Sequence, residues 1–149
     1  MDIYNFIIQL AAGFISTLAF SFLFNAPKKS ILVCSVIGAA GWLAYYYVKL
    51  ISGIIIASFS GAIIIGVLAS SASKKLRMPA TIFIYTGIIP LVPGYGMYHT
   101  MRSLVTKSYH LAAKIGIDTI LQAGAIAVGI LIASMFSSSI RRVKIQRKR

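Results

Sequence analysis

Long apolar runs separated by short basic stretches dominate the hydrophobic pattern of this chain. The runs cover residues 3–24, 31–48, 50–72, 79–98 and 119–140. A helix needs about 20 apolar residues to cross the hydrocarbon core of a bilayer. Four runs satisfy this requirement without interruption, whereas 79–98 contains internal prolines. The pattern predicts an all-α, polytopic integral membrane protein with about five transmembrane helices, one of them broken by Pro and Gly.

The broken run contains the sequence Ile88-Ile89-Pro90-Leu91-Val92-Pro93-Gly94. Proline lacks a backbone donor and clashes with the preceding turn, which costs about 3 kcal/mol in a helix interior. Lipid cannot satisfy the freed carbonyl groups, so a break survives only beside protein or a water-filled cavity. Transporters use such discontinuous helices to hold substrates. The break is therefore a candidate transport site, and a simple proline kink is the alternative.

The residues at the break and in the turns after it supply the candidate substrate-binding groups. We select Pro90, Pro93, Gly94, Tyr95, Tyr98, His99 and Arg102. A second half-helix is expected to start near Tyr95, where free backbone N–H groups would suit an anionic group such as a carboxylate. Gly94 is expected to allow backbone conformations that other residues avoid. Arg102 either guards the outer vestibule or anchors at lipid headgroups.

The stretch between the break and the last run mixes basic and apolar residues. Its spacings near three and four over residues 99–117 predict a short amphipathic helix at the interface. Asp118 follows, at the expected start of the last span, and Asp2 is the only other acidic residue. The favoured role of Asp118 is an N-cap that satisfies free backbone donors. Proton or cation coupling is the alternative role.

Several polar residues lie within the predicted spans. They are Gln9, Gln122, Ser16, Ser21, Ser58 and Ser60. They either line a polar path or form hydrogen bonds across helices and back to their own carbonyl groups. Small residues four apart, Ala57/Gly61 and Ala125/Gly129, allow helices to approach closely. We expect this packing within one bundle, with homo-oligomerisation as the alternative.

Charge sets the expected topology. The net charge is +13, and the bases cluster at the ends of the apolar runs: Lys28 and Lys29, then Lys74, Lys75 and Arg77, then six between Arg141 and Arg149. This distribution is typical of the positive-inside rule and not of nucleic-acid binding. Five crossings place these eleven bases (2 + 3 + 6) in the cytoplasm. The expected location is the inner or plasma membrane, with the N-terminus outside and the basic tail 141–149 cytoplasmic.

Composition argues for a single membrane domain over residues 1–149 and against an enzyme. Of the residues, 58% are hydrophobic and 11% are charged, against roughly 25% charged in soluble domains. Cys34 is the only cysteine, so no internal disulfide forms. The sequence offers no carboxylate pair, HExxH motif or phosphate-binding glycine loop. We therefore expect no catalytic residue, metal or cofactor.

Three stretches resemble motifs of the threonine/serine exporter (ThrE-type) family. They are Phe24-Asn25-Ala26-Pro27-Lys28-Lys29, Gly38-Ala39-Ala40-Gly41-Trp42, and Pro79-Ala80-Thr81-Ile82-Phe83 followed by residues 88–94 and Tyr98. They occur in the order and spacing of that family across nearly the whole chain. The chain is similar to the small C-terminal half of such exporters, which is a separate subunit in the split form.

The resemblance implies a larger partner membrane subunit and export of a small carboxylate-bearing metabolite, driven by the proton-motive force. Fused members export threonine and serine, and a split pair of similar layout is associated with succinate export. The resemblance implies no residue-level site, so the residues at the break remain our own inference. We expect a subunit of a secondary-active exporter of small amino or carboxylic acids. The alternatives are a non-transporting assembly or scaffold subunit and an oligomeric pore.

Overall fold

The structure is a computed structural model that describes residues 3–146, with side chains for residues 3–136. Its elements are α1 (Ile3–Leu23), α2 (Lys28–Ser52), α3 (Ile54–Leu76), α4 (Ala80–Ile88), the 3-10 helix η1 (Ile89–Leu91), α5 (Gly94–Val105) and α6 (Tyr109–Gln146). Within this part of the chain, four helices are long and apolar enough to cross a membrane, and the bent pair α4–α5 would make a fifth. The all-α, polytopic prediction is confirmed.

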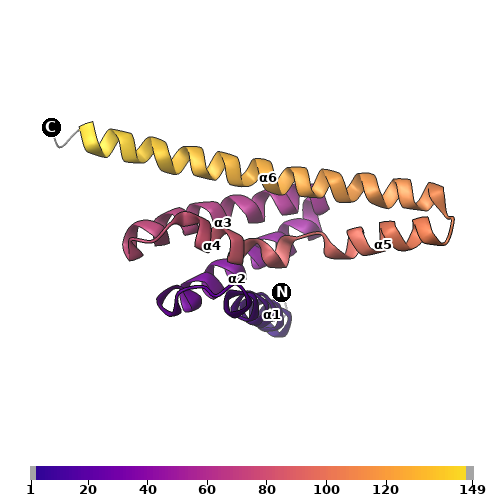
Figure 1. Cartoon of the computed structure of the whole chain (residues 1–149), viewed down its shortest axis with the longest axis horizontal. Helices are drawn as coiled ribbons and strands as arrows, with labels where there is room; N and C mark the ends of the chain where they lie inside the picture. The colour runs from indigo at the N-terminus through magenta and orange to yellow at the C-terminus, as the bar shows by residue number, and fades with distance from the viewer. Residues whose placement is uncertain (1–2, 147–149) are drawn as a thin grey trace.

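Helix α3 lies at the centre of the bundle. It packs against α2, α4 and α6, while α1 packs against the outer side of α2 (Figure 1). The core between these helices includes Ile65, Phe83 and Leu91, which are almost completely buried. Helix α5 packs on α6, and together they form a hairpin that extends beyond the ends of α2 and α3 (Figure 1).

Glycines allow the helices of the bundle to approach closely. A Cβ added to Gly61 on α3 would lie 2.9 Å from the Gly41 carbonyl oxygen on α2. A Cβ added to Gly129 on α6 would lie 2.8 Å from the Phe59 carbonyl oxygen on α3. Gly61 and Gly129 each belong to one of the predicted small-residue pairs. Both therefore serve contacts within the chain, as expected from their spacing.

A single residue, Gly53, separates α2 from α3. Its φ of 83° lies in the left-handed region that side chains with a Cβ disfavour, so glycine suits this turn. The resulting hairpin brings the end of α2, with Lys49, beside the start of α3 at Ile54. This junction forms one wall of the cavity described below.

The predicted interfacial helix over residues 99–117 is wrong. Helix α5 continues to Val105, and α6 starts at Tyr109 after a three-residue turn. Lys107 has a φ of 59°, and the Ser108 N–H donates to the Ser103 carbonyl at 2.8 Å, which ends α5. The apolar spacing continues through both segments, so it did not reveal this turn. The last helix therefore begins ten residues before the predicted start at 119 (119 − 109).

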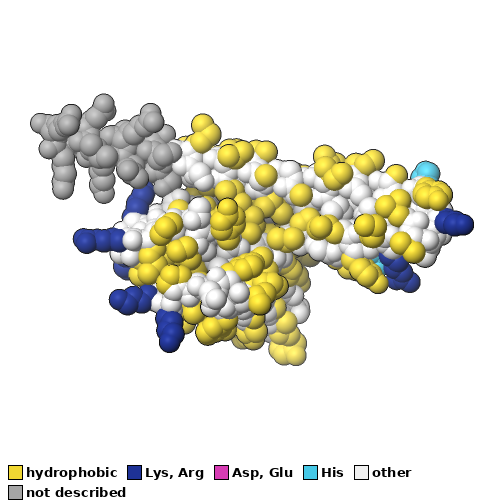
Figure 2. All heavy atoms as spheres, viewed as in Figure 1, with side chains coloured by type: hydrophobic (Ala, Val, Ile, Leu, Met, Phe, Trp, Pro, Cys, Tyr) yellow, Lys and Arg dark blue, Asp and Glu magenta, His cyan; other side chains and the backbone are white. Residues whose placement is uncertain are grey.

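Basic side chains gather at two ends of the molecule (Figure 2). One group surrounds the start of α2 and the end of α3 and comprises Lys28, Lys29, Lys74, Lys75 and Arg77. The other lies on the α5–α6 hairpin and comprises Arg102, Lys107 and Lys114. Exposed apolar side chains cover much of the surface between these ends (Figure 2). This arrangement suits a membrane location. The side chains of the basic tail 141–149 lie outside those described.

Candidate functional site

The segment with the prolines is interrupted as a helix, not only kinked. The axes of Ala80–Leu91 and Gly94–Val105 differ by 54°. Pro90 lies within η1, and Val92 has the extended ψ of 129° that ends it. The Gly94 N–H donates to the Val92 carbonyl at 2.8 Å, and this tight turn leads directly into α5. Two half-helices of twelve residues each therefore meet at the break.

A cavity of about 410 Å³ lies beside this interruption, and we call it the break cavity. Its lining residues are Pro90, Leu91, Val92, Pro93, Tyr95 and Gly96 from the broken segment, Trp42, Tyr45 and Lys49 from α2, Ile54 from α3, and Ile115, Asp118, Thr119 and Gln122 from α6. The volume lies within the range of about 300–1,000 Å³ typical of small-molecule sites. Four helices and the break thus converge on one ligand-sized space.

The polar groups of the break cavity come from α2 and α6. Gln122 is only 7% exposed, and its amide has no hydrogen-bond partner within the described residues. Asp118 also lines the cavity and forms no ion pair in that same part of the chain. The Lys49 ammonium lies 5.8 Å from the centre of the Tyr45 ring. An exposed acid, an exposed base and the amide of a largely buried glutamine therefore border one cavity, and none of their polar atoms is sealed from water without a partner.

Backbone donors add to these side chains. Helix α5 starts at Gly94, and the first N–H groups of a helix have no intrahelical acceptor. The N–H groups of Gly94 and Met97 bond to the carbonyls of Val92 and Pro93. The N–H groups of Tyr95 and Gly96 have no such backbone partner among the described residues. Tyr95 and Gly96 both line the break cavity.

Comparison with known proteins decides the family. The family profile described as "Threonine/Serine exporter, ThrE" matches residues 9–136, which include all the lining residues of the break cavity. The chain belongs to the threonine/serine exporter family. This membership supports transport of the exporter type rather than catalysis.

One relative of this exporter-family chain shares only part of its sequence. An "Uncharacterized protein" from Haemophilus influenzae is 29% identical over 92 residues, which make up 61% of this chain and 31% of that protein. The match therefore covers less than a third of the length of that relative. No solved structure matches the chain.

The structure brings only some of the predicted site residues of this chain together. Pro90, Pro93 and Tyr95 line the break cavity. Gly94 lies next to them, but its φ is not positive, so the expected special backbone conformation is wrong. A Cβ on Gly94 would meet nothing within 4 Å.

The other predicted residues lie further along α5. The His99 ring packs against Tyr95, with centroids 4.1 Å apart, and against Tyr98, with centroids 5.4 Å apart. Arg102 is exposed. None of Tyr98, His99 and Arg102 is among the lining residues of the break cavity. Tyr95 links the two sets, because it contacts His99 and also lines the cavity.

The favoured capping role of Asp118 is wrong. Helix α6 starts at Tyr109, so Asp118 lies nine residues (118 − 109) inside the helix. A residue at this depth has a backbone already bonded within the helix, and its side chain has no free N-terminal donors to accept from. Its carboxylate instead lines the break cavity with Lys49, a residue that the sequence patterns did not single out.

Most of the other polar residues in the spans serve packing. The Trp42 Nε1–H donates to Gln9 Oε1 at 2.9 Å, which joins α2 to α1. Ser21, Ser58 and Ser60 donate to carbonyls of their own helices. These residues therefore form hydrogen bonds between helices or to their own carbonyl groups, which was one of the two roles expected for them. Gln122 lines a polar cavity instead.

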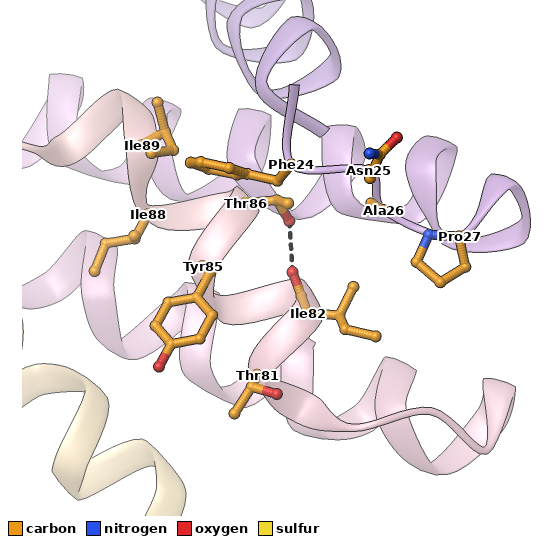
Figure 3. A pocket seen from close by; sticks show the side chains of 10 residues that line it. All are labelled: Phe24, Asn25, Ala26, Pro27, Thr81, Ile82, Tyr85, Thr86, Ile88 and Ile89. Atoms are coloured by element: carbon orange, nitrogen blue, oxygen red, sulfur yellow. Dashed lines mark hydrogen bonds between the residues drawn. The ribbon is translucent and has the colours of Figure 1, made fainter. Parts of the chain in front are cut away.

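A second hollow, of about 590 Å³, lies beside α4 (Figure 3). It is lined by Phe24, Asn25, Ala26, Pro27, Thr81, Ile82, Tyr85, Thr86, Ile88 and Ile89. Most of these side chains are apolar, and the Thr86 hydroxyl already donates to the Ile82 carbonyl at 2.8 Å (Figure 3). The family-like motif after α1 thus packs opposite α4. This apolar pocket offers little to bind a charged substrate.

Proposed function

We propose that this chain is a subunit of a secondary-active exporter of small amino or carboxylic acids, and that the substrate binds in the break cavity. Family membership supports the transport role. The observation that carries the site is the meeting of an interrupted helix with Lys49, Asp118 and Gln122 around one ligand-sized cavity. Transporter sites combine these same elements, a discontinuous helix and polar groups that face it.

The substrate carboxylate would bind at the α5 end of the break cavity. The unpaired N–H groups of Tyr95 and Gly96 lie at the start of α5, where the helix dipole favours a negative charge. Lys49 would add a full positive charge from α2. Pro93 sets the direction of the chain into α5 and therefore fixes where these donors lie. Tyr98, His99 and Arg102 would act further out, on the approach to the cavity.

The two hollows favour alternating access across the broken segment. Ile88 and Ile89 line the apolar pocket, whereas the next residues, from Pro90 onward, line the break cavity. Thr86, which lines the apolar pocket, and Leu91, which lines the break cavity, are both almost fully buried. A change of angle at the break would close one hollow as it opens the other. The proton-motive force would drive the cycle, with Asp118 as a candidate for the coupling group.

The larger partner subunit would complete the transport path. The chain matches less than a third of the length of its Haemophilus influenzae relative, which leaves room in that protein for a further membrane segment of the kind we propose as the partner. The α5–α6 hairpin also exposes large apolar side chains on both helices, including Met97, Met101, Leu104 and Ile120. These side chains would contact the partner or lipid. A scaffold role without transport remains the second candidate, since it needs only this surface.

Export from intact cells tests the proposal. Threonine, serine and succinate efflux would be measured in strains that lack this chain, the larger subunit or both. We expect equal loss in all three strains for an obligate two-part exporter. Full export without this chain would contradict the proposal. Lys49→Ala distinguishes transport at the break cavity from a scaffold role. Transport at the break cavity predicts that the variant loses export but still forms the complex, whereas a scaffold role predicts that both export and complex formation are retained.

A further inference from the structure

The apolar pocket beside α4 lies next to a group of bases. One wall of the pocket is formed by residues 24–27, which link α1 to α2, and the other by residues 81–89 of α4 and η1 (Figure 3). The first wall continues directly into Lys28 and Lys29, and the second begins four residues after Arg77 (81 − 77). Both walls therefore adjoin the bases that gather at this end of the molecule (Figure 2).

The apolar pocket is long and extends away from these bases. Helix α4 runs from the basic end toward the break (Figure 1), and at 1.5 Å per residue the distance from Thr81 to Ile89 (89 − 81 = 8) is about 12 Å. Thr86 is 2% exposed, whereas Phe24 and Tyr85 are 52% and 67% exposed. The pocket is therefore open along one side, where lipid would surround the bundle. A long apolar groove that is open to lipid suits an acyl chain.

The bases beside the apolar pocket have no acidic partner in the described part of the chain. Their side chains are exposed, and Asp118, the one acid of that part, lines the break cavity on α6 instead. Lys28 and Lys29 also occupy the first turn of α2, which contains no acidic residue and where the helix dipole opposes positive charge. The positive charge beside the pocket is therefore left for an anion from outside the chain.

We propose that the apolar pocket binds an anionic phospholipid, with one acyl chain between residues 24–27 and α4 and the phosphate at Lys28, Lys29 and Arg77. A phospholipid joins an apolar chain to an anion, as the pocket adjoins the bases. A neutral lipid would leave the charges unmatched, and a soluble anion would leave the pocket empty. The pocket is separate from the break cavity, so this assignment goes beyond the proposed function and does not depend on it.

Lipid affinities of the purified protein test the headgroup and the acyl chain separately. Native mass spectrometry from a neutral detergent would compare phosphatidylglycerol and phosphatidylcholine that carry identical oleoyl chains. We expect phosphatidylglycerol to bind about tenfold or more tightly, since each nearby base contributes to the attraction. The preference should shrink when the salt concentration is raised about tenfold, because exposed charges are screened. Glycerol 3-phosphate, which has the anion without the chains, should not displace the bound lipid.

Photolabelling locates the acyl chain on the native protein. Phosphatidylglycerol with a photoreactive group in one chain would be incorporated, activated by light and mapped by peptide mass spectrometry. We expect the label on residues 24–27 and 81–89, the two walls of the apolar pocket. The purified complex with the larger subunit should give the same labelled peptides.

Paired substitutions test the two parts of the site. Lys28→Gln combined with Lys29→Gln should lower the affinity for phosphatidylglycerol about tenfold or more and leave that for phosphatidylcholine unchanged. Lys107→Gln combined with Lys114→Gln is the matched control, because it removes the same charge from the α5–α6 hairpin, away from the lining residues. Thr81→Trp should obstruct the pocket and weaken the binding of both lipids, whereas Thr81→Val should not.

Several outcomes would overturn the lipid assignment. Equal affinities of the native protein for the two lipids would do so, as would equal effects of the Lys28/Lys29 and Lys107/Lys114 substitutions. Displacement by glycerol 3-phosphate would indicate a soluble anion instead. Loss of the label in the complex would show that the larger subunit fills the pocket. If the Lys28/Lys29 variant cannot be purified, Lys28→Arg with Lys29→Arg keeps the charge and should keep the lipid preference, and its loss would count equally against the assignment.

Discussion

Gly96 on α5 lies directly against Thr119 on α6. A Cβ added to Gly96 would collide with the Thr119 hydroxyl oxygen, and this hydroxyl already donates to the Ile115 carbonyl at 2.7 Å. Both residues line the break cavity, and Thr119 follows Asp118 in sequence. This close approach of α5 to α6 therefore also sets how near the start of α5 lies to Asp118.

Gly96→Ala should disturb this contact. The added methyl group has to displace Thr119 or separate the helices, and such overpacking costs about 1–3 kcal/mol. We expect a lower thermal stability of the purified protein and at least a several-fold loss of export. Gly94→Ala is the matched control, because a Cβ there meets nothing within 4 Å. Equal effects of the two substitutions would contradict the importance of the Gly96–Thr119 contact.

A second pair of glycines tests the contact between α6 and α3. Gly129→Ala would place a methyl group 2.8 Å from the Phe59 carbonyl oxygen, and should destabilise the protein by about 1–3 kcal/mol. Gly124→Ala lies on the same helix in open space, and should be neutral or stabilise by about 0.5–1 kcal/mol through helix propensity. Thermal unfolding in detergent measures both. A destabilised Gly124→Ala variant would argue against this packing.

The hydrogen bond between Trp42 and Gln9 should hold α1 against α2. Gln9→Leu removes the acceptor of the indole N–H, and hydrogen bonds between membrane helices contribute about 0.6 kcal/mol on average. A double-mutant cycle with Trp42→Phe, read by thermal unfolding, isolates the pair. We expect the two effects to be non-additive. Strict additivity would mean that the bond does not contribute.

Single cysteines should report on which side of the membrane each end of the bundle lies. Cys34 is fully buried in the core, so Cys34→Ala provides the background. Five crossings place Lys75→Cys inside and Lys107→Cys outside, and a membrane-impermeant maleimide added to intact cells should label only the second. A re-entrant segment between α3 and α6 would put both residues on the same side and give the same labelling.

The sequence predicted the membrane helices well because their signal is a property of composition over about 20 residues. It also located the break correctly, because proline acts on its own local backbone. The turn at 106–108 was missed, since the apolar spacing runs through it and Lys107 is not a usual residue for a positive φ. Asp118 was then placed at a helix start that does not exist.

The site was predicted only in part, because the sequence shows local neighbours and not contacts between distant helices. Pro90, Pro93 and Tyr95 were found because they are adjacent to the break in sequence. Lys49 comes from α2, more than forty residues earlier (93 − 49 = 44), and only the packing of helices brings it to the cavity. That Asp118 forms no ion pair with the described side chains is likewise a property of the fold. The scarcity of acids in the sequence was the one available indication.

The uninterrupted helix α6 has 38 residues, and at 1.5 Å per residue it is about 57 Å long. The hydrocarbon core of a bilayer is only about 30 Å thick. A rod of this length cannot be contained in the membrane at ordinary tilt, so at least one end projects into water or into another protein. One end of α6 at least, at the hairpin turn beside Tyr109 or at Gln146, would thus form a rigid arm beyond the lipid surface, which another protein could reach without touching the membrane.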